Sequence, residues 1–456
     1  MNGPLWTSAE IAAATGGIAS ADFAVSGVAF DSREVGPGDL FVAMKGEATD
    51  GHRFLDRALA QGATGAIVSE ATGHPHVRVN DGFAALQALG HAGRARTGAR
   101  IIGVTGSVGK TSAKEALFAA LDRSIPGQVH RSVKSYNNHT GVPLSLARMP
   151  RGAKIGVFEM GMNHAGELAD LTRMVRPDVA IVTAIAPAHT EFFPDESAIA
   201  DAKGEIFQGL EPGGTAIVPF DSPHRDRLIA AARPRAAHIV TFGLNDGADV
   251  RAIEAMRLPT GTFMTARVGD EELSVTIAQA GMHWVSNALA VLAAVQAVGA
   301  DPGLAGLALA DLGGLAGRGA RRTIPVDGGE VLLIDESYNA NPASMAATLA
   351  VLAHEPGRHV AVLGEMRELG AASPAYHAAL AEPILAANVE RALLVGEAMK
   401  PLAEALEGRI DFVHAPDTQA ALVSLRQMLA AGDTVLVKGS NGVGLARLVA
   451  GLGGVT

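Results

Sequence analysis

The run from Gly103 to Thr111 reads Gly-Val-Thr-Gly-Ser-Val-Gly-Lys-Thr and has the residue types that cradle a phosphate group. Glycines let main-chain N–H groups turn inward onto phosphate oxygens, and the start of a helix adds a favourable dipole. In such a loop the lysine contacts the β- and γ-phosphates of a nucleotide, and the next hydroxyl binds Mg²⁺. We therefore predict that ATP and Mg²⁺ bind here, through Gly106, Ser107, Val108, Gly109, Lys110, Thr111 and Ser112.

The residues on both sides of this loop fit the motif. Ile101–Val104 is an apolar run typical of a buried strand, and Lys110–Asp122 has its apolar residues on one face of a helix. The first glycine of the usual pattern would fall at Val104, so a glycine-rich turn without a ligand is the alternative. Because strand, Gly-Lys-Thr and helix coincide, we favour nucleotide binding.

Two further polar residues follow predicted buried strands. Glu159 ends the apolar run Ile155–Phe158, and His189 follows Val179–Thr183. Ligands of open α/β sheets bind at the carboxyl ends of the strands, and carboxylate oxygens suit Mg²⁺. Glu159 is therefore placed to reach a metal ion. A solvated acid and a structural histidine are the alternatives for these two residues.

Asp335 and Glu336 end the predicted strand Val331–Ile334 and precede the polar, turn-forming run Ser337–Pro342. A polar run directly after a buried strand is typical of a binding site, although a turn into a helix would have the same composition. Lys203 lies on a predicted helix, and by itself it would be interpreted as an ordinary solvated lysine.

Three blocks of alternating strands and helices position these residues. Residues 1–82 form a small α/β unit with turn-rich connections. In residues 83–317 short apolar runs alternate with helices, which predicts a mostly parallel sheet covered on both faces, with a hairpin at its edge in residues 262–280. Residues 318–456 predict a doubly wound, Rossmann-like unit whose helices include one at 375–387. The predicted fold class is α/β with three domains.

The composition limits the function. The chain has 456 residues, too many for one core, and 48% hydrophobic against 18% charged residues is typical of a globular protein. The formal net charge of -10 argues against a nucleic-acid binder that relies on a basic surface. The absence of cysteine excludes disulfides, thiolate metal sites and a cysteine nucleophile, and it fits a reducing compartment.

The segment Ala280–Ala300 contains no Asp, Glu, Lys or Arg and is long enough to span a membrane. However, it is rich in alanine and holds His283, Ser286, Asn287 and Gln296. These polar side chains would be costly in lipid, so we predict a buried core helix.

The runs that could do chemistry together resemble the Mur ligase family of peptidoglycan synthesis, almost from end to end. Besides the phosphate loop, the resemblance rests on Asp31–Arg33, Gly38–Ala43, Asp50–His52, Asn137–Leu144, Glu159–Gly161, Ala188–His189, Ala202–Glu205, Asn287–Ala288, Gly317–Arg318, Ser337–Pro342, Leu363–Met366, Glu368–Gly370 and Lys438–Ser440. It implies a cytoplasmic, ATP-dependent enzyme that forms amide bonds on UDP-linked muramoyl peptides.

The resemblance also implies roles for individual residues. The UDP moiety would be held in the first domain by Ser32, Arg33, Asp50, Gly51 and His52, and the muramoyl part in the middle domain by Asn137 and Asn138. Besides the phosphate loop, ATP would contact Asn287, Arg318 and Asp335. One Mg²⁺ would bind Thr111 and Glu159, and a second His189 and Lys203, the latter as a carbamate whose oxygens suit a hard metal. Lys110, Glu159, His189 and Lys203 would carry catalysis.

Two runs, Tyr338–Pro342 and Asn137–Leu144, resemble the family member that adds D-alanyl-D-alanine to a UDP-N-acetylmuramoyl-tripeptide, while the Asp-Asn-Pro-Arg signature of the diaminopimelate-adding member is absent. The implied reaction passes through an acyl phosphate. A sister ligase that adds a single amino acid and a folyl- or cyanophycin-type relative are alternatives, as is a nucleotide-dependent switch. We expect a monomer without a membrane span or a nucleic-acid partner.

Four positions depart from the family pattern. Ala184 stands where Asn is usual, and Thr190 where Leu is usual. Glu336 replaces a common Asp, and His139 replaces a residue that is often acidic or small and polar. None of the four belongs to the predicted metal ligands, and Ala184 and His139 bear on the details of substrate contact.

Overall fold

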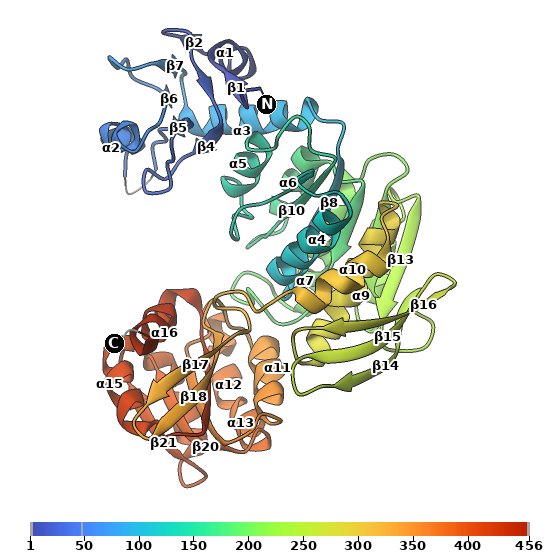
Figure 1. The fold of residues 1–456 in the computed structure, drawn as a ribbon, viewed down its shortest axis with the longest axis vertical. Coiled ribbons are helices and arrows are strands. Elements are labelled where there is room, and N and C mark those ends of the chain that lie inside the picture. Colours follow the sequence, from blue (N-terminus) through green and yellow to red (C-terminus); the bar gives the residue numbers. More distant parts are fainter. Residues whose placement is uncertain (1–2, 47–48, 454–456) are drawn as a thin grey trace.

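The computed structural model describes residues 3–46 and 49–453, which form three large β-sheets in succession along the chain (Figure 1). The N-terminal unit holds a five-stranded sheet, the middle unit a nine-stranded sheet and the C-terminal unit a six-stranded sheet. Most neighbouring strands are parallel, which confirms the predicted α/β class with three successive units. The limits at 82/83 and 317/318 stay predictions.

The N-terminal unit is a small sheet with helices packed on it. Its elements are β1 (Trp6–Thr7), α1 (Ser8–Thr15), β2 (Ile18–Ala19), β3 (Ala24–Val25), β4 (Gly27–Ala29), β5 (Asp39–Val42), η1 (Gly51–Phe54), α2 (Leu55–Ala60), β6 (Gly65–Val68), β7 (His76–Arg78) and α3 (Gly82–Ala95). The strands lie in the order β2-β7-β6-β5-β4, and β1 pairs separately with β3. Leu40, Ile67 and Val77 are fully buried in a core that also contains Leu86 and Leu89 of α3.

The middle unit places the phosphate loop after β8, an inner strand of its sheet. Its elements are β8 (Arg100–Thr105), α4 (Lys110–Ser124), β9 (Val129–Arg131), α5 (Gly141–Ala147), β10 (Ile155–Glu159), α6 (Glu167–Val175), β11 (Val179–Val182), α7 (Glu196–Gly204), η2 (Glu205–Gly209), β12 (Thr215–Pro219), α8 (Arg225–Ala232), β13 (His238–Gly243), β14 (Val250–Arg257), β15 (Thr262–Val268), β16 (Glu271–Ile277), α9 (Met282–Ala297) and α10 (Pro302–Asp311). Strand β8 lies between β10 and β11 and is parallel to both. The hairpin of β15 and β16 forms the edge of the sheet, as predicted.

The C-terminal unit follows with a sheet in the order β17-β18-β22-β19-β20-β21. Its elements are β17 (Ala320–Val326), β18 (Gly329–Glu336), α11 (Pro342–Leu352), β19 (Arg358–Gly364), η3 (Gly370–Ala372), α12 (Ser373–Ala378), α13 (Ala381–Ala386), β20 (Val389–Val395), η4 (Glu397–Met399), α14 (Lys400–Leu406), β21 (Asp411–Ala415), α15 (Thr418–Met428), β22 (Asp433–Lys438), η5 (Asn441–Val443) and α16 (Leu445–Gly453). Only β17 among its strands is antiparallel to its neighbour.

Two details of the C-terminal unit differ from the sequence prediction. The single helix expected at 375–387 is two short helices, because Pro383 has no N–H to donate and its ring clashes with a continuing turn. Strand β17 was not predicted, because Arg321, Arg322 and Pro325 make it polar; proline is tolerated there because β17 is an edge strand.

Helix α9 is the uncharged segment that was long enough to span a membrane. Its residues Val285, Leu289 and Leu292 are fully buried in the core beneath the middle sheet, together with residues of α4 and α10. The predicted core helix is therefore confirmed. Among the helices of the described residues, none has both the length and the apolar character that a membrane crossing needs.

A cluster of charges joins the middle and C-terminal units. Glu355, which follows α11, accepts a hydrogen bond from Arg257 Nη2 at 2.6 Å and further bonds from the guanidinium of Arg321. Arg257 ends β14 and also donates to the carbonyl oxygen of His354 at 3.3 Å. Burial by itself would raise the pKa of Glu355, but the hydrogen bonds from both arginines bring it below its usual value. The carboxylate therefore stays charged and holds the two units together.

We predict that Glu355→Ala lowers the free energy of unfolding by about 2 kcal/mol, because it leaves two arginines facing each other without a counter-charge. It should also increase the radius of gyration in small-angle X-ray scattering. The matched control is Glu382→Ala, which removes a surface carboxylate 2.8 Å from Arg409 and should cost no more than about 0.5 kcal/mol. Equal effects of the two variants in urea titrations would contradict the assignment.

Candidate active site

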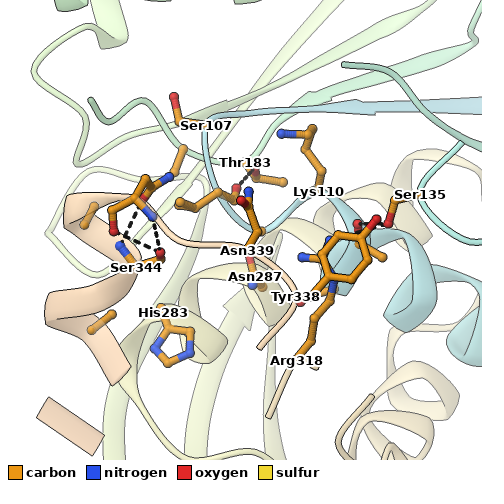
Figure 2. Close-up of a pocket in the computed structure, with 18 of the residues that line it drawn as sticks. Ser107, Lys110, Ser135, Thr183, His283, Asn287, Arg318, Tyr338, Asn339 and Ser344 are labelled. Atoms are coloured by element: carbon orange, nitrogen blue, oxygen red, sulfur yellow. Dashed lines mark hydrogen bonds between the residues drawn. The ribbon is translucent and has the colours of Figure 1, made fainter. Parts of the chain in front are cut away.

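A cavity of about 470 Å³ lies between the middle and C-terminal units. Figure 2 shows its lining, with Ser107 and Lys110 contributed by the middle unit and Tyr338 and Asn339 by the C-terminal unit. The predicted site residues that line it are Ser107, Val108, Gly109, Lys110, Thr111, Ser112, Asn137, Glu159, His189, Asn287 and Arg318. The fold thus brings together residues that are more than two hundred positions apart in the sequence.

The phosphate loop connects β8 to α4 and has the backbone that its sequence predicts. Gly109 has φ of +86°, and a Cβ atom there would lie 2.5 Å from Oδ1 of Asn287. Glycine is therefore required, and Asn287 of α9 lies directly against the loop. Lys110 Nζ donates to the carbonyl oxygen of Gly106 at 2.6 Å. Burial lowers the pKa of Lys110, and the carboxylate of Glu159 acts in the opposite direction.

The segment that follows β11 braces the phosphate loop. Thr183 Oγ1 donates to the carbonyl oxygen of Val108 at 2.5 Å, and the Ser107 N–H donates to the carbonyl oxygen of Ala184 at 2.8 Å. The contact of Ala184 uses its backbone, so the departure from the family's Asn leaves this brace intact.

Glu159 is the acid that contacts the Thr111 hydroxyl, which the loop sequence predicts as a magnesium ligand. Its side chain is 1% exposed, and Oε2 accepts a hydrogen bond from Thr111 Oγ1 at 2.8 Å. Oε1 accepts one from Asn137 Nδ2 at 2.7 Å, and the Glu159 N–H donates to Ser132 Oγ at 3.1 Å. Carboxylate and hydroxyl are thus held together, as one metal site requires.

Lys203 is fully buried in the last turn of α7, and its Nζ has no hydrogen-bond partner among the described residues. Burial, together with the positive charge of Lys110, lowers its pKa well below the usual value. The lowered pKa favours the neutral amine, which is the form that reacts with carbon dioxide. Lys203 does not itself line the cavity, but its chemistry fits the predicted carbamate.

His189 lines the cavity, and its Nδ1 lies 2.6 Å from Oε2 of Glu368, which belongs to the C-terminal unit. In residues 3–46 and 49–453 no three His, Asp or Glu side chains converge in a way that could hold a metal ion. The predicted metal sites therefore depend on oxygens of the nucleotide and of the modified Lys203, besides Thr111 and Glu159.

The C-terminal wall of the cavity carries a cation stacked on an aromatic ring. The guanidinium of Arg318 lies 4.1 Å from the centroid of the Tyr338 ring, and Arg318 Nη2 donates to Ser135 Oγ at 3.4 Å. Burial lowers the pKa of Lys438 and raises that of Glu336, whose carboxylate Oε2 lies 3.6 Å from Lys438 Nζ. This wall presents positive charge toward the phosphate loop.

Besides Lys203, three residues predicted for the middle and C-terminal units lie off the cavity lining. Asp335 uses both carboxylate oxygens to accept main-chain N–H groups, those of Gly317 at 3.0 Å and of Ser337 at 3.1 Å. Asn138 Oδ1 accepts the N–H of Gly141 at 2.9 Å, at the start of α5. Gly106 contributes its carbonyl oxygen, which accepts the hydrogen bond from Lys110 Nζ. Asp335 and Asn138 thus shape the backbone of the site.

The residues predicted to hold a UDP moiety lie in the N-terminal unit and do not line this cavity. They follow the adjacent parallel strands β4 and β5 and are Ser32, Arg33, Asp50, Gly51 and His52. His52 Nδ1 lies 2.6 Å from Asp50 Oδ1, and its Nε2 accepts the N–H of Ser69 at 2.9 Å. Arg33 is exposed and forms an ion pair with Asp31 at 2.5 Å. The structure therefore brings these residues to one edge of the N-terminal sheet.

Sequence reasoning missed Lys114, a fully buried cation on α4. Its Nζ donates to the carbonyl oxygens of Ser132 and Lys134 and lies 2.9 Å from Oε1 of Glu115. It thereby anchors the loop that carries Asn137. The only sequence signal for this role was that Lys114 lies one helical turn after Lys110.

The phosphate loop after an inner strand of a mostly parallel sheet, with a doubly wound unit across the cavity, defines a nucleotide-dependent enzyme that works between two units. Residues 24–91 match the model described as "Mur ligase family, catalytic domain", residues 104–295 match "Mur ligase middle domain", and residues 321–441 match "Mur ligase, glutamate ligase domain". The chain belongs to the Mur ligase family, whose members are ATP-dependent enzymes that form amide bonds.

Relatives match over nearly the whole chain. The UDP-N-acetylmuramoyl-tripeptide–D-alanyl-D-alanine ligase of Escherichia coli strain K12 is 36% identical, with 96% of each chain covered. A crystal structure of MurF from Acinetobacter baumannii superposes with a TM-score of 0.84 at 31% identity and 98% coverage of each chain. MurF ligase of Thermotoga maritima in complex with ADP gives 0.77 at 28% identity, with 94% of this chain and 97% of that chain covered.

We predict that Lys203→Met raises the melting temperature in buffer free of carbon dioxide and metal, and that the gain grows as the pH falls below about 10. The folded pKa of Lys203 is depressed by burial, so between the folded and the unfolded pKa the unfolded chain binds a proton that the folded chain lacks, and wild-type stability decreases as the pH falls through that window. Methionine does not titrate, so the variant lacks this pH dependence. A gain that is independent of pH would contradict the depressed pKa.

Proposed function

We propose that this chain joins D-alanyl-D-alanine to UDP-N-acetylmuramoyl-tripeptide with ATP, in the cytoplasmic synthesis of peptidoglycan precursors. The observation that carries the proposal is the full-length similarity to relatives with this activity, at 31–36% identity in Escherichia coli and Rickettsia prowazekii. The cavity supports it, because the phosphate loop faces the C-terminal unit across a space in which two substrates can meet.

The donor set at the phosphate end of the cavity fits two Mg²⁺ ions. Thr111 and Glu159 would hold one ion, and His189 with the carbamate of Lys203 would hold the second. When bound, the ions offset negative charge on the transferring phosphoryl group. Lys110 adds a fixed positive charge at the same end, and Asn137 keeps the carboxylate of Glu159 in place through its 2.7 Å hydrogen bond.

The proposed chemistry activates a carboxylate before an amine attacks it, because a carboxylate oxygen is a poor leaving group. An oxygen of the tripeptide's terminal carboxylate attacks the γ-phosphorus of ATP, ADP leaves, and an acyl phosphate forms. The amine of D-alanyl-D-alanine then attacks the acyl carbon, phosphate leaves, and the nitrogen gives up a proton. A cavity enclosed by two units protects the acyl phosphate from water.

We assign the three units separate tasks: 1–82 binds the UDP moiety, 83–317 binds ATP, and 318–456 brings the incoming dipeptide. Contacts between the first two units support this arrangement. Tyr136 OH donates to Oε1 of Glu34 at 2.7 Å, directly after Arg33. A long substrate held by the N-terminal unit would reach the cavity along the segment that contains Asn137 and Asn138. The enzyme would act as a monomer.

The function is tested by measuring phosphate release with ATP, Mg²⁺ and UDP-N-acetylmuramoyl-tripeptide while the amine substrate is varied. We expect release with D-alanyl-D-alanine and at least about 100-fold less with L-lysine, diaminopimelate or L-glutamate, because a site that hydrogen-bonds a dipeptide rejects analogues lacking those groups. Preference for a single amino acid would replace the proposal with a sister ligase. ATP turnover without any dependence on the peptide would indicate a nucleotide switch.

The carbamate is tested by Lys203→Ala. We expect ligation to fall by at least about 100-fold, because an oxygen ligand of the second ion is lost, and to recover partly when formate or acetate is added to occupy the space. The control is Lys154→Ala, which removes an exposed lysine of the same unit. Substantial activity of Lys203→Ala without added carboxylate would contradict the assigned role.

A further inference from the structure

The middle and C-terminal units meet backbone to backbone beside the phosphate end of the cavity. The N–H of Glu191 donates to the carbonyl oxygen of Glu368 at 3.2 Å, and Thr190 Oγ1 donates to the carbonyl oxygen of Leu369 at 3.1 Å. Gly370 has φ of +55°, and a Cβ atom there would lie 3.0 Å from Cα of Glu191. Two short segments, 189–191 and 368–370, are thus in close contact.

The shortest hydrogen bond of this contact involves a predicted metal ligand. His189 Nδ1 lies 2.6 Å from Oε2 of Glu368. A carboxylate oxygen only accepts hydrogen bonds, so this contact is made with an N–H at Nδ1 of the His189 ring. Nε2 is then the ring nitrogen left for a metal ion.

Both residues adopt a backbone conformation that other residues avoid. His189 has φ of +59° and Glu368 has φ of +62°, in the left-handed region that is unfavourable for side chains with a Cβ atom. Such strain persists only where the surroundings enforce it, and it concentrates at functional sites. Here it occurs in both partners of one hydrogen bond between two units.

We propose that Glu368 is a positioning residue of the second metal site: it orients His189 and fixes its tautomer, so that the site is complete only when the C-terminal unit is docked. The inference rests on the proposed function, which assigns His189 to that site. A metal-ligating histidine ordinarily donates its other N–H to a carboxylate, which fixes the ring and raises its basicity. In this chain the ligand and its carboxylate come from different units, so metal affinity and docking are coupled.

The test measures Mn²⁺ binding to the full-length protein by electron paramagnetic resonance of the free ion, with a non-hydrolysable ATP analogue and carbon dioxide present. We expect Glu368→Gln and Glu368→Ala to weaken the second Mn²⁺ by about 10- to 100-fold and to leave the first unchanged. The ¹⁵N shifts of the His189 ring, identified by their loss in His189→Gln, should report protonation at Nδ1 in the wild type and a tautomer mixture in Glu368→Ala.

The matched control is Thr190→Val, which removes the neighbouring hydrogen bond between the units but leaves the His189 ring untouched. It should keep wild-type Mn²⁺ affinity at both sites. An equal loss in Thr190→Val would overturn the inference, because the effect would then come from docking alone. Wild-type binding by both Glu368 variants would overturn it as well.

The variant His189→Ala distinguishes a failure of the role of Glu368 from a failure of the metal assignment of His189. If it abolishes the second Mn²⁺ and the Glu368 variants do not weaken it, the role of Glu368 fails while the metal assignment stands. If His189→Ala binds both ions as the wild type does, the metal assignment of the proposed function fails, and the inference fails with it.

Discussion

The buried carboxylate of Glu159 is the group on which the rest of the site depends. A charge that is 1% exposed is costly unless donors meet it. The donors come from two other segments, Thr111 at the start of α4 and Asn137 in the loop before α5, at 2.8 and 2.7 Å. Strand, helix and loop must therefore keep their relative positions for the buried carboxylate to keep both donors. That constraint also gives the phosphate loop a fixed acidic neighbour, which is what a magnesium-dependent phosphoryl transfer requires.

The loop from 132 to 138 extends this constraint to the other two units. Lys114 donates a hydrogen bond to the backbone of this loop, at the carbonyl oxygen of Ser132. Tyr136 of the loop contacts Glu34 of the N-terminal unit, and Ser135 accepts a hydrogen bond from Arg318 of the C-terminal unit. The three units thus meet beside the hydroxyl of Thr111. Contacts such as the pair of His189 and Glu368 then complete the site from the opposite side. A reaction that joins two substrates needs such convergence, because each substrate can be held by a different unit.

Much of this could be predicted from the sequence where the signal is local. The phosphate loop is continuous in the chain, so its glycines, lysine and threonine indicate strand, turn and helix at once. Glu159 was placed correctly because a buried strand puts its last residue at the ligand-binding edge. Prediction failed where the cause is not periodic. The helix expected at 375–387 breaks at residues 379–380, one turn before Pro383, and β17 is polar because it lies at an edge.

The sequence by itself determined the α/β class, the nucleotide loop, the buried nature of α9 and, through its resemblance, the family. Only the tertiary structure decided which distant residues meet. Lys203 was interpreted from its sequence as a solvated residue, yet packing buries its Nζ without a hydrogen-bond partner among the described residues and so lowers its pKa. Glu368 belongs to a run that resembles the family, but the sequence assigns it no partner, and it reaches His189 only because two units dock. The physical reason is that desolvation and contacts between units depend on the summed positions of many side chains, whereas the periodicity of a strand or helix is already present in its own residues.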